Sequence, residues 1–231
     1  MPSSDYARLV ARVDEIRLKF INFTIPADRN PLQEELDCIA AFRLLVHAEF
    51  EHFLEDRVRY ALSESLRLWK TKNTVTHTLL NAFAAFAHRV GDDKLRSLST
   101  VQDFEKRIND HIRQIEEILD KNNGIKKSAF SELAHFCGCR IEDLPSELIG
   151  QLHSFGEARG AVAHKRVDRV RSLNSPDIEA AQVKEIVDLL EQFDEAINSC
   201  VSERIAGAPS AGHIMVATKA VQSNLVSPEN T

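Results

Sequence analysis

A long stretch without helix breakers constrains this chain more than any other feature. From Leu32 to Thr71 the sequence contains neither Gly nor Pro. Apolar residues recur in it at steps of three and four, at Ile39, Phe42, Val46, Phe50 and Phe53. That spacing places them on one face of a helix. The sequence therefore predicts one very long amphipathic helix from Leu32 to about Thr71.

Helical periodicity extends over most of the remaining chain. The 8 Gly and 7 Pro of 231 residues are too few for the turns of an all-β sandwich or barrel. We predict an all-α fold, a single domain over residues 1–206 with about six or seven helices. Besides the long helix, we expect helices over about 4–22, 100–119, 128–136, 145–166 and 176–201. A further helix should begin at a cap, Asn73 or Thr74, and end at 86–89. Residues 207–231 are small, polar and nearly uncharged, which predicts a flexible tail or a strap.

Composition narrows the class of protein. Lys and Arg number 29 against 35 Asp and Glu, a net charge of −6, which argues against a general nucleic-acid coat. No apolar run approaches the ~18 residues of a membrane span, and the N-terminus has no apolar signal core. The four cysteines are then most simply free thiols in a reducing cytosol. These features predict a cytoplasmic protein that has no membrane partner.

Several catalytic and cofactor motifs are missing from the sequence. It has no G-x-G-x-x-G, no G-x-x-x-x-G-K-[ST] and no H-E-x-x-H. Cys137 and Cys139 are separated by one residue, whereas a zinc knuckle has two between its cysteines, and the sequence has no second cysteine pair that could complete a zinc site. We expect them to be small buried residues near a helix end. The sequence predicts neither a cofactor nor a metal site.

One group of residues has the side chains that a catalytic or binding site needs, and it lies in the helix predicted over 145–166. Arg159 falls on the apolar stripe of that helix, between Phe155 and Val162, where an Arg is costly unless it is paired. His164 follows five residues later, about 140° around an ideal helix. The next seven residues contain four cations, Lys165, Arg166, Arg169 and Arg171. Arg159 and His164 would therefore flank a groove, or use the looseness that Gly156 and Gly160 give the helix, and in either case they lie beside a strongly basic segment.

The arrangement Arg159-Gly-Ala-Val-Ala-His164 resembles the R-x4-H motif of the HEPN superfamily, in the form R-G-x-x-A-H of its RiboL-PSP-like branch. A second block, HAEFEHFL from His47 to Leu54, is similar to the acidic position of that superfamily and puts Glu51 in the matching place. The resemblance covers roughly residues 32–205. It implies a HEPN-like helical bundle with extra helices. Two departures are Gly160 in place of a polar residue after Arg159, and Arg166 in place of a Tyr two residues after His164.

The resemblance implies a metal-independent endoribonuclease that serves a toxin–antitoxin pair or anti-phage defence. In such a reaction the ribose 2′-OH attacks the phosphorus, a histidine moves the proton and an arginine binds the phosphate. His164 and Arg159 supply those two groups, and Glu51 could orient Arg159. The basic run Lys165, Arg166, Arg169 and Arg171 would follow the RNA backbone. The expected partners are RNA and an antitoxin or other regulatory protein.

A homodimer is also expected. One R-x4-H per chain supplies one imidazole, whereas cleavage benefits from a base and an acid. A two-fold dimer with the 145–166 helices facing each other would supply the second His164. The resemblance agrees, because HEPN domains are similar in pairing their motifs into one composite cleft.

Two other classes of function stay open. The chain could be a non-catalytic HEPN-like module that binds nucleotide, RNA or a protein partner, or a plain helical interaction protein. In either case Arg159 could be a structural ion-pair partner of Glu51, His164 a helix C-terminal histidine, and the basic run an ordinary cationic turn. His153 and Glu157 read as a solvated i,i+4 pair. We expect surface positions on amphipathic helices for His47, His52 and His77.

Overall fold

The computed structural model describes residues 1–85, 101–164 and 173–202, and the side chains within them except those of 101, 102, 163 and 164. The described part is helical and contains no strand. In chain order its helices are α1 (Ser4–Phe20), α2 (Gln33–Lys72), α3 (His77–Ala84), α5 (Val101–Leu119), α6 (Lys127–Phe136), the short 3₁₀ helix η2 (Ile141–Asp143), α7 (Ser146–His164) and α8 (Pro176–Ser202). The all-α prediction is confirmed.

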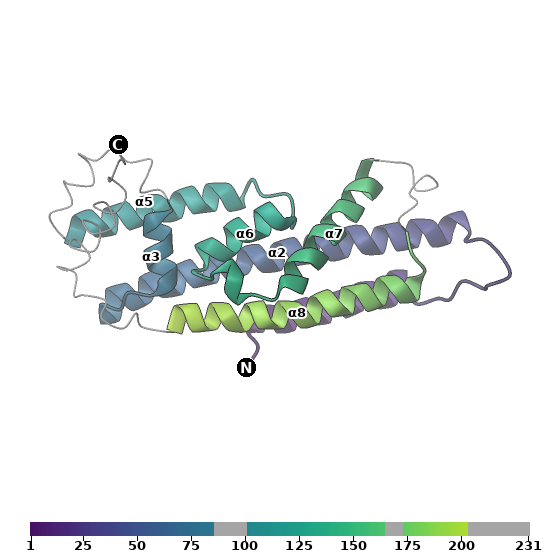
Figure 1. Cartoon of the computed structure of the whole chain (residues 1–231), viewed down its shortest axis with the longest axis horizontal. Helices are drawn as coiled ribbons and strands as arrows, with labels where there is room; N and C mark the ends of the chain where they lie inside the picture. The colour runs from purple at the N-terminus through teal and green to yellow at the C-terminus, as the bar shows by residue number, and fades with distance from the viewer. Residues whose placement is uncertain (86–100, 165–172, 203–231) are drawn as a thin grey trace, which may run out of the picture.

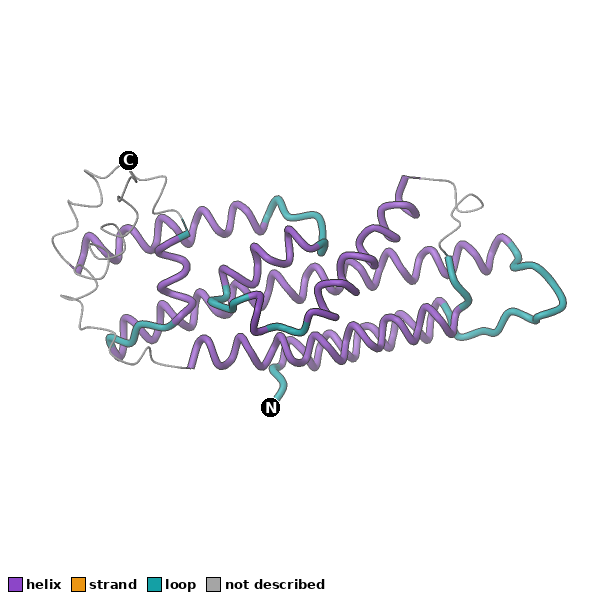
Figure 2. The backbone as a smooth tube through the Cα atoms, viewed as in Figure 1, coloured by secondary structure: helices purple, strands orange, loops and turns teal. Residues whose placement is uncertain are grey.

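α2 and α8 lie side by side as one elongated layer, and α1 packs against both (Figures 1 and 2). α2 and α8 run along the molecule in the same direction, and α1 lies against both in the opposite direction. The apolar stripe predicted for α2 is buried throughout, with Phe42, Val46 and Phe50 at 0% exposure. The stripe of α8 is buried in the same way, at Val183, Ile186, Leu190, Phe193, Ile197 and Val201. The long apolar faces therefore bury one another, as the sequence pattern predicts.

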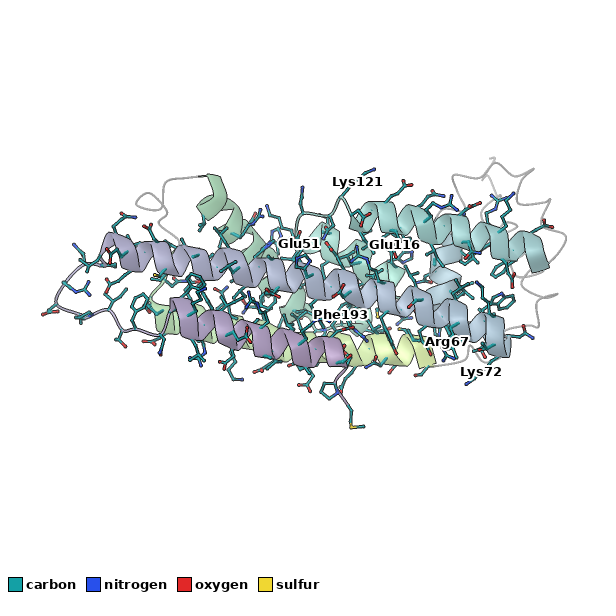
Figure 3. All side chains as sticks on the ribbon, turned by 180° about the vertical axis from the view of Figure 1, so that it is seen from behind. Glu51, Arg67, Lys72, Glu116, Lys121 and Phe193 are labelled. Carbon is teal, nitrogen blue, oxygen red and sulfur yellow. The ribbon has the colours of Figure 1, made fainter. Side chains whose placement is uncertain are left out.

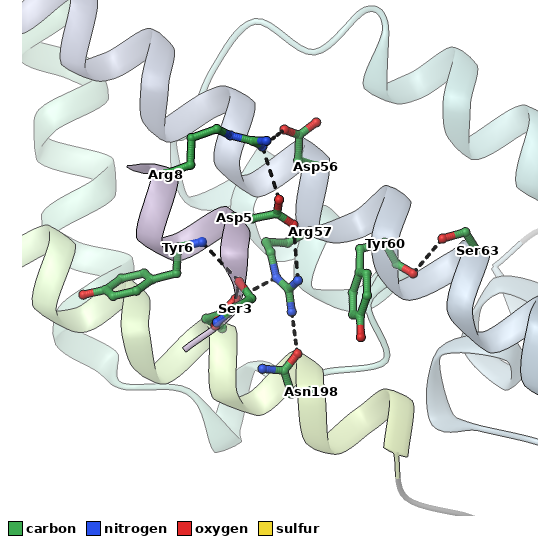
Figure 4. A network of polar contacts seen from close by, with 10 residues as sticks. Ser3, Asp5, Tyr6, Arg8, Asp56, Arg57, Tyr60, Ser63 and Asn198 are labelled. Atoms are coloured by element: carbon green, nitrogen blue, oxygen red, sulfur yellow. Dashed lines mark hydrogen bonds and ion pairs between the residues drawn. The ribbon is translucent and has the colours of Figure 1, made fainter. Parts of the chain in front are cut away.

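Buried ion pairs join α8 to α2 inside this layer. Arg43 pairs with Glu179, and their side chains are 1% and 0% exposed. Farther along, Arg57 Nε lies 2.8 Å from Asp194 Oδ1, and Arg57 donates to Asn198 Oδ1 at 2.7 Å (Figure 4). The two arginines are too large and too polar to be buried without these partners. The pairs therefore fix the register between α2 and α8.

A second group of helices covers the other face of α2. α5, α6 and α7 lie on it, and α3 crosses between α2 and α5 (Figure 1). α7 crosses the layer diagonally, and near its C-terminal end Val162 is buried against Ala40 of α2. In the part of the chain that the structure describes, no helix combines the length and apolar character that a membrane crossing requires.

Helix boundaries agree with the prediction except at the two ends of α3. Asn73 adopts the left-handed conformation, with φ of 49°, and ends α2 instead of capping α3. The cap of α3 is Thr76, whose hydroxyl accepts from the Leu79 N–H. Asn tolerates the left-handed conformation well enough to close a helix, so the same residue type suits either role. α3 ends at Ala84, two to five residues before the end expected at 86–89. The end expected at 165–166, the cap at Thr100 and the tail 207–231 fall in segments that the structure does not describe.

The prediction that Cys137 and Cys139 are buried near a helix end is confirmed. Cys137 and Cys139 are 0% and 5% exposed at the C-terminal end of α6, and both are free thiols. Burial raises the pKa of Cys137 well above its ordinary range, so this thiol is unreactive. Among the described residues, no three His, Cys, Asp or Glu side chains converge as a metal site would need.

Candidate functional site

Arg159 borders a pocket of about 330 Å³ between α2, α6 and α7. The pocket is lined by His47 from α2, by Asn122, Asn123 and Gly124 from the segment between α5 and α6, by Lys126, Ser128 and Ala129 at the start of α6, and by Gly156, Arg159 and Gly160 from α7. Arg159 is half-buried, and among the described residues none forms a hydrogen bond or an ion pair with it. Its guanidinium is therefore available to a ligand in the pocket.

Aromatic contacts position this part of α7 on α2. The ring of Phe155, one turn before Arg159, lies 5.6 Å from the ring of Phe50 and 6.4 Å from the imidazole of His47. The planes of His47 and Phe155 are stacked, with an angle of 14° between them. Because all three side chains are buried, these contacts hold the Arg159 turn of α7 beside the His47–Glu51 turn of α2.

His47 is buried and was expected at the surface, so that prediction is wrong. Its side chain is 2% exposed, whereas His52 and His77 are exposed as predicted. Burial, and to a smaller extent the positive charge of Arg159, lowers the pKa of His47 from 6.5 to about 4. At neutral pH the pocket is therefore lined by an uncharged imidazole, whose Nδ1 is buried without a hydrogen-bond partner.

Glu51 lies midway along α2 (Figure 3), close to this group but not bonded to Arg159 in the described structure. Its Oε2 is 3.9 Å from His47 Nδ1, and its Oε1 is buried without a hydrogen-bond partner. Burial and the nearby charge of Glu55 raise the pKa of Glu51, while Arg159 acts in the opposite direction. Arg159 is thus within electrostatic range of Glu51, but the direct pair that the sequence suggested is not formed.

The other predicted site residues lie at or beyond the end of α7. His164 is its last described residue, and its side chain is not among those described. Lys165, Arg166, Arg169 and Arg171 fall within 165–172, which the structure does not describe. The chain is described again from Leu173, and Glu179 accepts from the backbone N–H and the side-chain amide of Asn174 at 3.0 and 3.1 Å. The buried Arg43–Glu179 pair therefore anchors the chain just after the basic segment.

The expectation that His153 and Glu157 form a solvated pair on α7 is confirmed. His153 Nε2 lies 3.8 Å from Glu157 Oε1, and their side chains are 45% and 62% exposed. This is a solvated i,i+4 pair outside the pocket.

Sequence reasoning missed His47 and Lys126. A signal for His47 was present, because Arg43, His47, Glu51 and Glu55 recur at steps of four beside the apolar stripe of α2. Such a polar stripe is buried when other helices cover both sides of the apolar face. No local pattern marks Lys126. It reaches the pocket because Gly156 lets the chain approach α7: a Cβ on Gly156 would lie 3.0 Å from Lys126 Cγ.

Comparison with protein families identifies the class of protein to which this fold and motif correspond. The RiboL-PSP-HEPN family model matches residues 7–199. The chain therefore belongs to the RiboL-PSP-HEPN family, as the residues around Arg159 and Glu51 suggested. Comparisons with curated proteins and with solved structures gave no significant match.

Proposed function

We propose that the protein is a metal-independent endoribonuclease of HEPN type, in which Arg159 binds an RNA phosphate and His164 transfers a proton. The observation that carries this proposal is the environment of Arg159. It lies at a pocket whose described lining includes a second cation, Lys126, and no carboxylate, in a chain of net charge −6. A guanidinium that is bonded to no described carboxylate in such a place suits a phosphate, which it can bind with two parallel hydrogen bonds.

The chemistry follows from these groups. The 2′-oxygen of a ribose attacks the adjacent phosphorus while an imidazole accepts the 2′-OH proton. The bond from phosphorus to the 5′-oxygen breaks, and that oxygen takes a proton from an acid. Arg159 would stabilise the charge that develops on the phosphate oxygens. The products are a 2′,3′-cyclic phosphate and a 5′-OH, and the cations from Lys165 to Arg171 would hold the neighbouring backbone.

A homodimer is part of this proposal. One His164 per chain supplies one imidazole for two proton transfers, and two α7 helices facing each other across a two-fold axis would supply the second. The two basic segments would then meet in one groove. Membership of the RiboL-PSP-HEPN family supports a role in a toxin–antitoxin pair or in anti-phage defence, in which an antitoxin or other regulatory protein would control the nuclease.

A non-catalytic nucleotide- or RNA-binding module is the second candidate. It is favoured by the absence of a described hydrogen bond or ion pair between Glu51 and Arg159, because no described carboxylate then orients the arginine for catalysis. Such a protein would bind RNA through the same cations and would leave it intact.

Incubation of the purified protein with total RNA and tRNA in EDTA tests the proposal. Cleavage by the wild type should persist in EDTA and should be lost in His164→Ala and in Arg159→Ala. His153→Ala is the matched control, because it removes a solvated histidine from the same helix. Loss of wild-type cleavage in EDTA would refute the metal-independent mechanism, and full activity of His164→Ala would refute the site. RNA binding without cleavage would favour the second candidate.

A further inference from the structure

The pocket beside Arg159 has groups that the cleavage mechanism does not use. Lys126 is the N-cap residue of α6, and no side chain caps that helix end. The first N–H groups of a helix have no partner within the helix and carry its partial positive charge. Ser128 and Ala129 of this first turn line the pocket. The wall of the pocket that α6 forms therefore presents the ammonium group of Lys126, the hydroxyl of Ser128 and the positive end of a helix of 10 residues.

His47 is an independent indication that the pocket takes a ligand. Its side chain is more than nine-tenths buried, it lines the pocket, and its Nδ1 has no hydrogen-bond partner. A buried polar atom without a partner is unfavourable, so His47 calls for a hydrogen-bonding group that the described residues do not supply. The described lining holds two cations, Lys126 and Arg159, and neutral polar groups but no carboxylate, so the ligand that this pocket favours is an anion.

We propose that this pocket is a phosphate-binding subsite, formed by Lys126, the first turn of α6 and His47, for the RNA phosphate adjacent to the one that Arg159 holds. The inference rests on the proposed function, because it takes the ligand of Arg159 to be an RNA strand. Arg159 stands at one wall of the pocket and the α6 terminus at another, so consecutive phosphates of one strand can occupy the two positions. The subsite would set which stretch of RNA lies across His164.

Two substitutions test the subsite by charge and by volume. Lys126→Ala removes the ammonium group, and Lys127→Ala is its control, because Lys127 is the next residue, is exposed and is not in the lining. Gly160→Leu fills the pocket without changing charge, since a Cβ on Gly160 meets nothing within 4 Å. Gly150→Leu is its control, because Gly150 lies on the same helix, has equally open surroundings and is not in the lining.

The measurement is the dissociation constant of a short fluorescent RNA, followed against salt concentration in a His164→Ala background so that no RNA is cut. Lys126→Ala should weaken binding and reduce the slope of log K against log salt by about 0.7, the value for one phosphate contact on a single strand. Gly160→Leu should weaken binding about tenfold, and both controls should stay within about twofold of the parent. Inorganic phosphate should displace the RNA more strongly than chloride at equal ionic strength.

The outcomes separate this subsite from the nuclease proposal. If each variant binds RNA with the same affinity and salt slope as its control, the subsite is wrong, even if the wild type cleaves RNA. If the variants behave as expected but the wild type never cleaves, the subsite stands and the nuclease proposal fails. Binding of adenosine monophosphate by the wild type with no measurable RNA binding would overturn the assignment of the pocket to an RNA strand.

Discussion

Acidification should destabilise the protein through His47. The pKa of this histidine is 6.5 in a solvated chain and about 4 in the folded protein. Between those values the unfolded chain carries a proton on His47 that the folded protein does not, so unfolding is favoured as the pH falls. Stability that is present above pH 6.5 is therefore lost progressively towards pH 4.

The magnitude follows from the two pKa values. Proton linkage gives a destabilisation of about 0.2 kcal/mol at pH 7 and about 2 kcal/mol at pH 5. Local rearrangement around a protonated His47 reduces part of this effect, so we expect the free energy of unfolding to fall by about 1.5 kcal/mol between these pH values because of His47.

Urea unfolding, followed by helical circular dichroism at pH 7, 6 and 5, measures this effect. His47→Gln removes the titrating group, so its free energy of unfolding should fall by about 1.5 kcal/mol less than that of the wild type over this range. His52→Gln is the matched control, because His52 is exposed on the same helix and is solvated in both states. The same pH dependence in wild type and His47→Gln would refute the burial argument.

Three further predictions concern ion pairing and assembly. Glu179→Gln leaves the buried Arg43 without its carboxylate and should lower the free energy of unfolding by about 3 kcal/mol in urea; a loss under about 1 kcal/mol would contradict the role of this pair. Glu51→Gln should leave stability at pH 7 unchanged or raise it by up to about 1 kcal/mol, because burial disfavours the charged carboxylate and no ion pair to Arg159 is lost; a clear decrease in melting temperature would argue for such a pair. Mixed dimers of wild type and His164→Ala should cleave RNA more slowly per wild-type site than wild-type dimers, and an unchanged rate per site would argue against a composite groove.

The long apolar stripes could be predicted from the sequence, and the polar contacts between helices could not. Steps of three and four in α2 and α8 determine which side chains face the core, whatever helix covers them. The partner of Arg43 lies 136 residues away in α8, and no local pattern indicates that pairing. The same limitation explains His47, because its burial depends on α7 crossing α2 at Phe155.

The candidate site was likewise predictable from the sequence only in part. The R-x4-H spacing and the block around Glu51 identified the family from the sequence. The stripe on α7 placed Arg159 on the core face, but a pocket opens between α2, α6 and α7 at that position, so Arg159 is half-buried at the pocket instead of paired in the core. The contribution of Lys126 depends on a close approach at Gly156, which only the assembled helices reveal.

Analysis of the RNA ends tests the central claim most directly. RNA incubated with the wild type in EDTA should yield fragments with a 2′,3′-cyclic phosphate and a 5′-OH. A substrate with 2′-deoxyribose at the cleaved nucleotide should remain intact, because it has no 2′-OH to attack the phosphorus. Fragments with 5′-phosphate ends, or cleavage of the 2′-deoxy substrate, would contradict the mechanism assigned to Arg159 and His164.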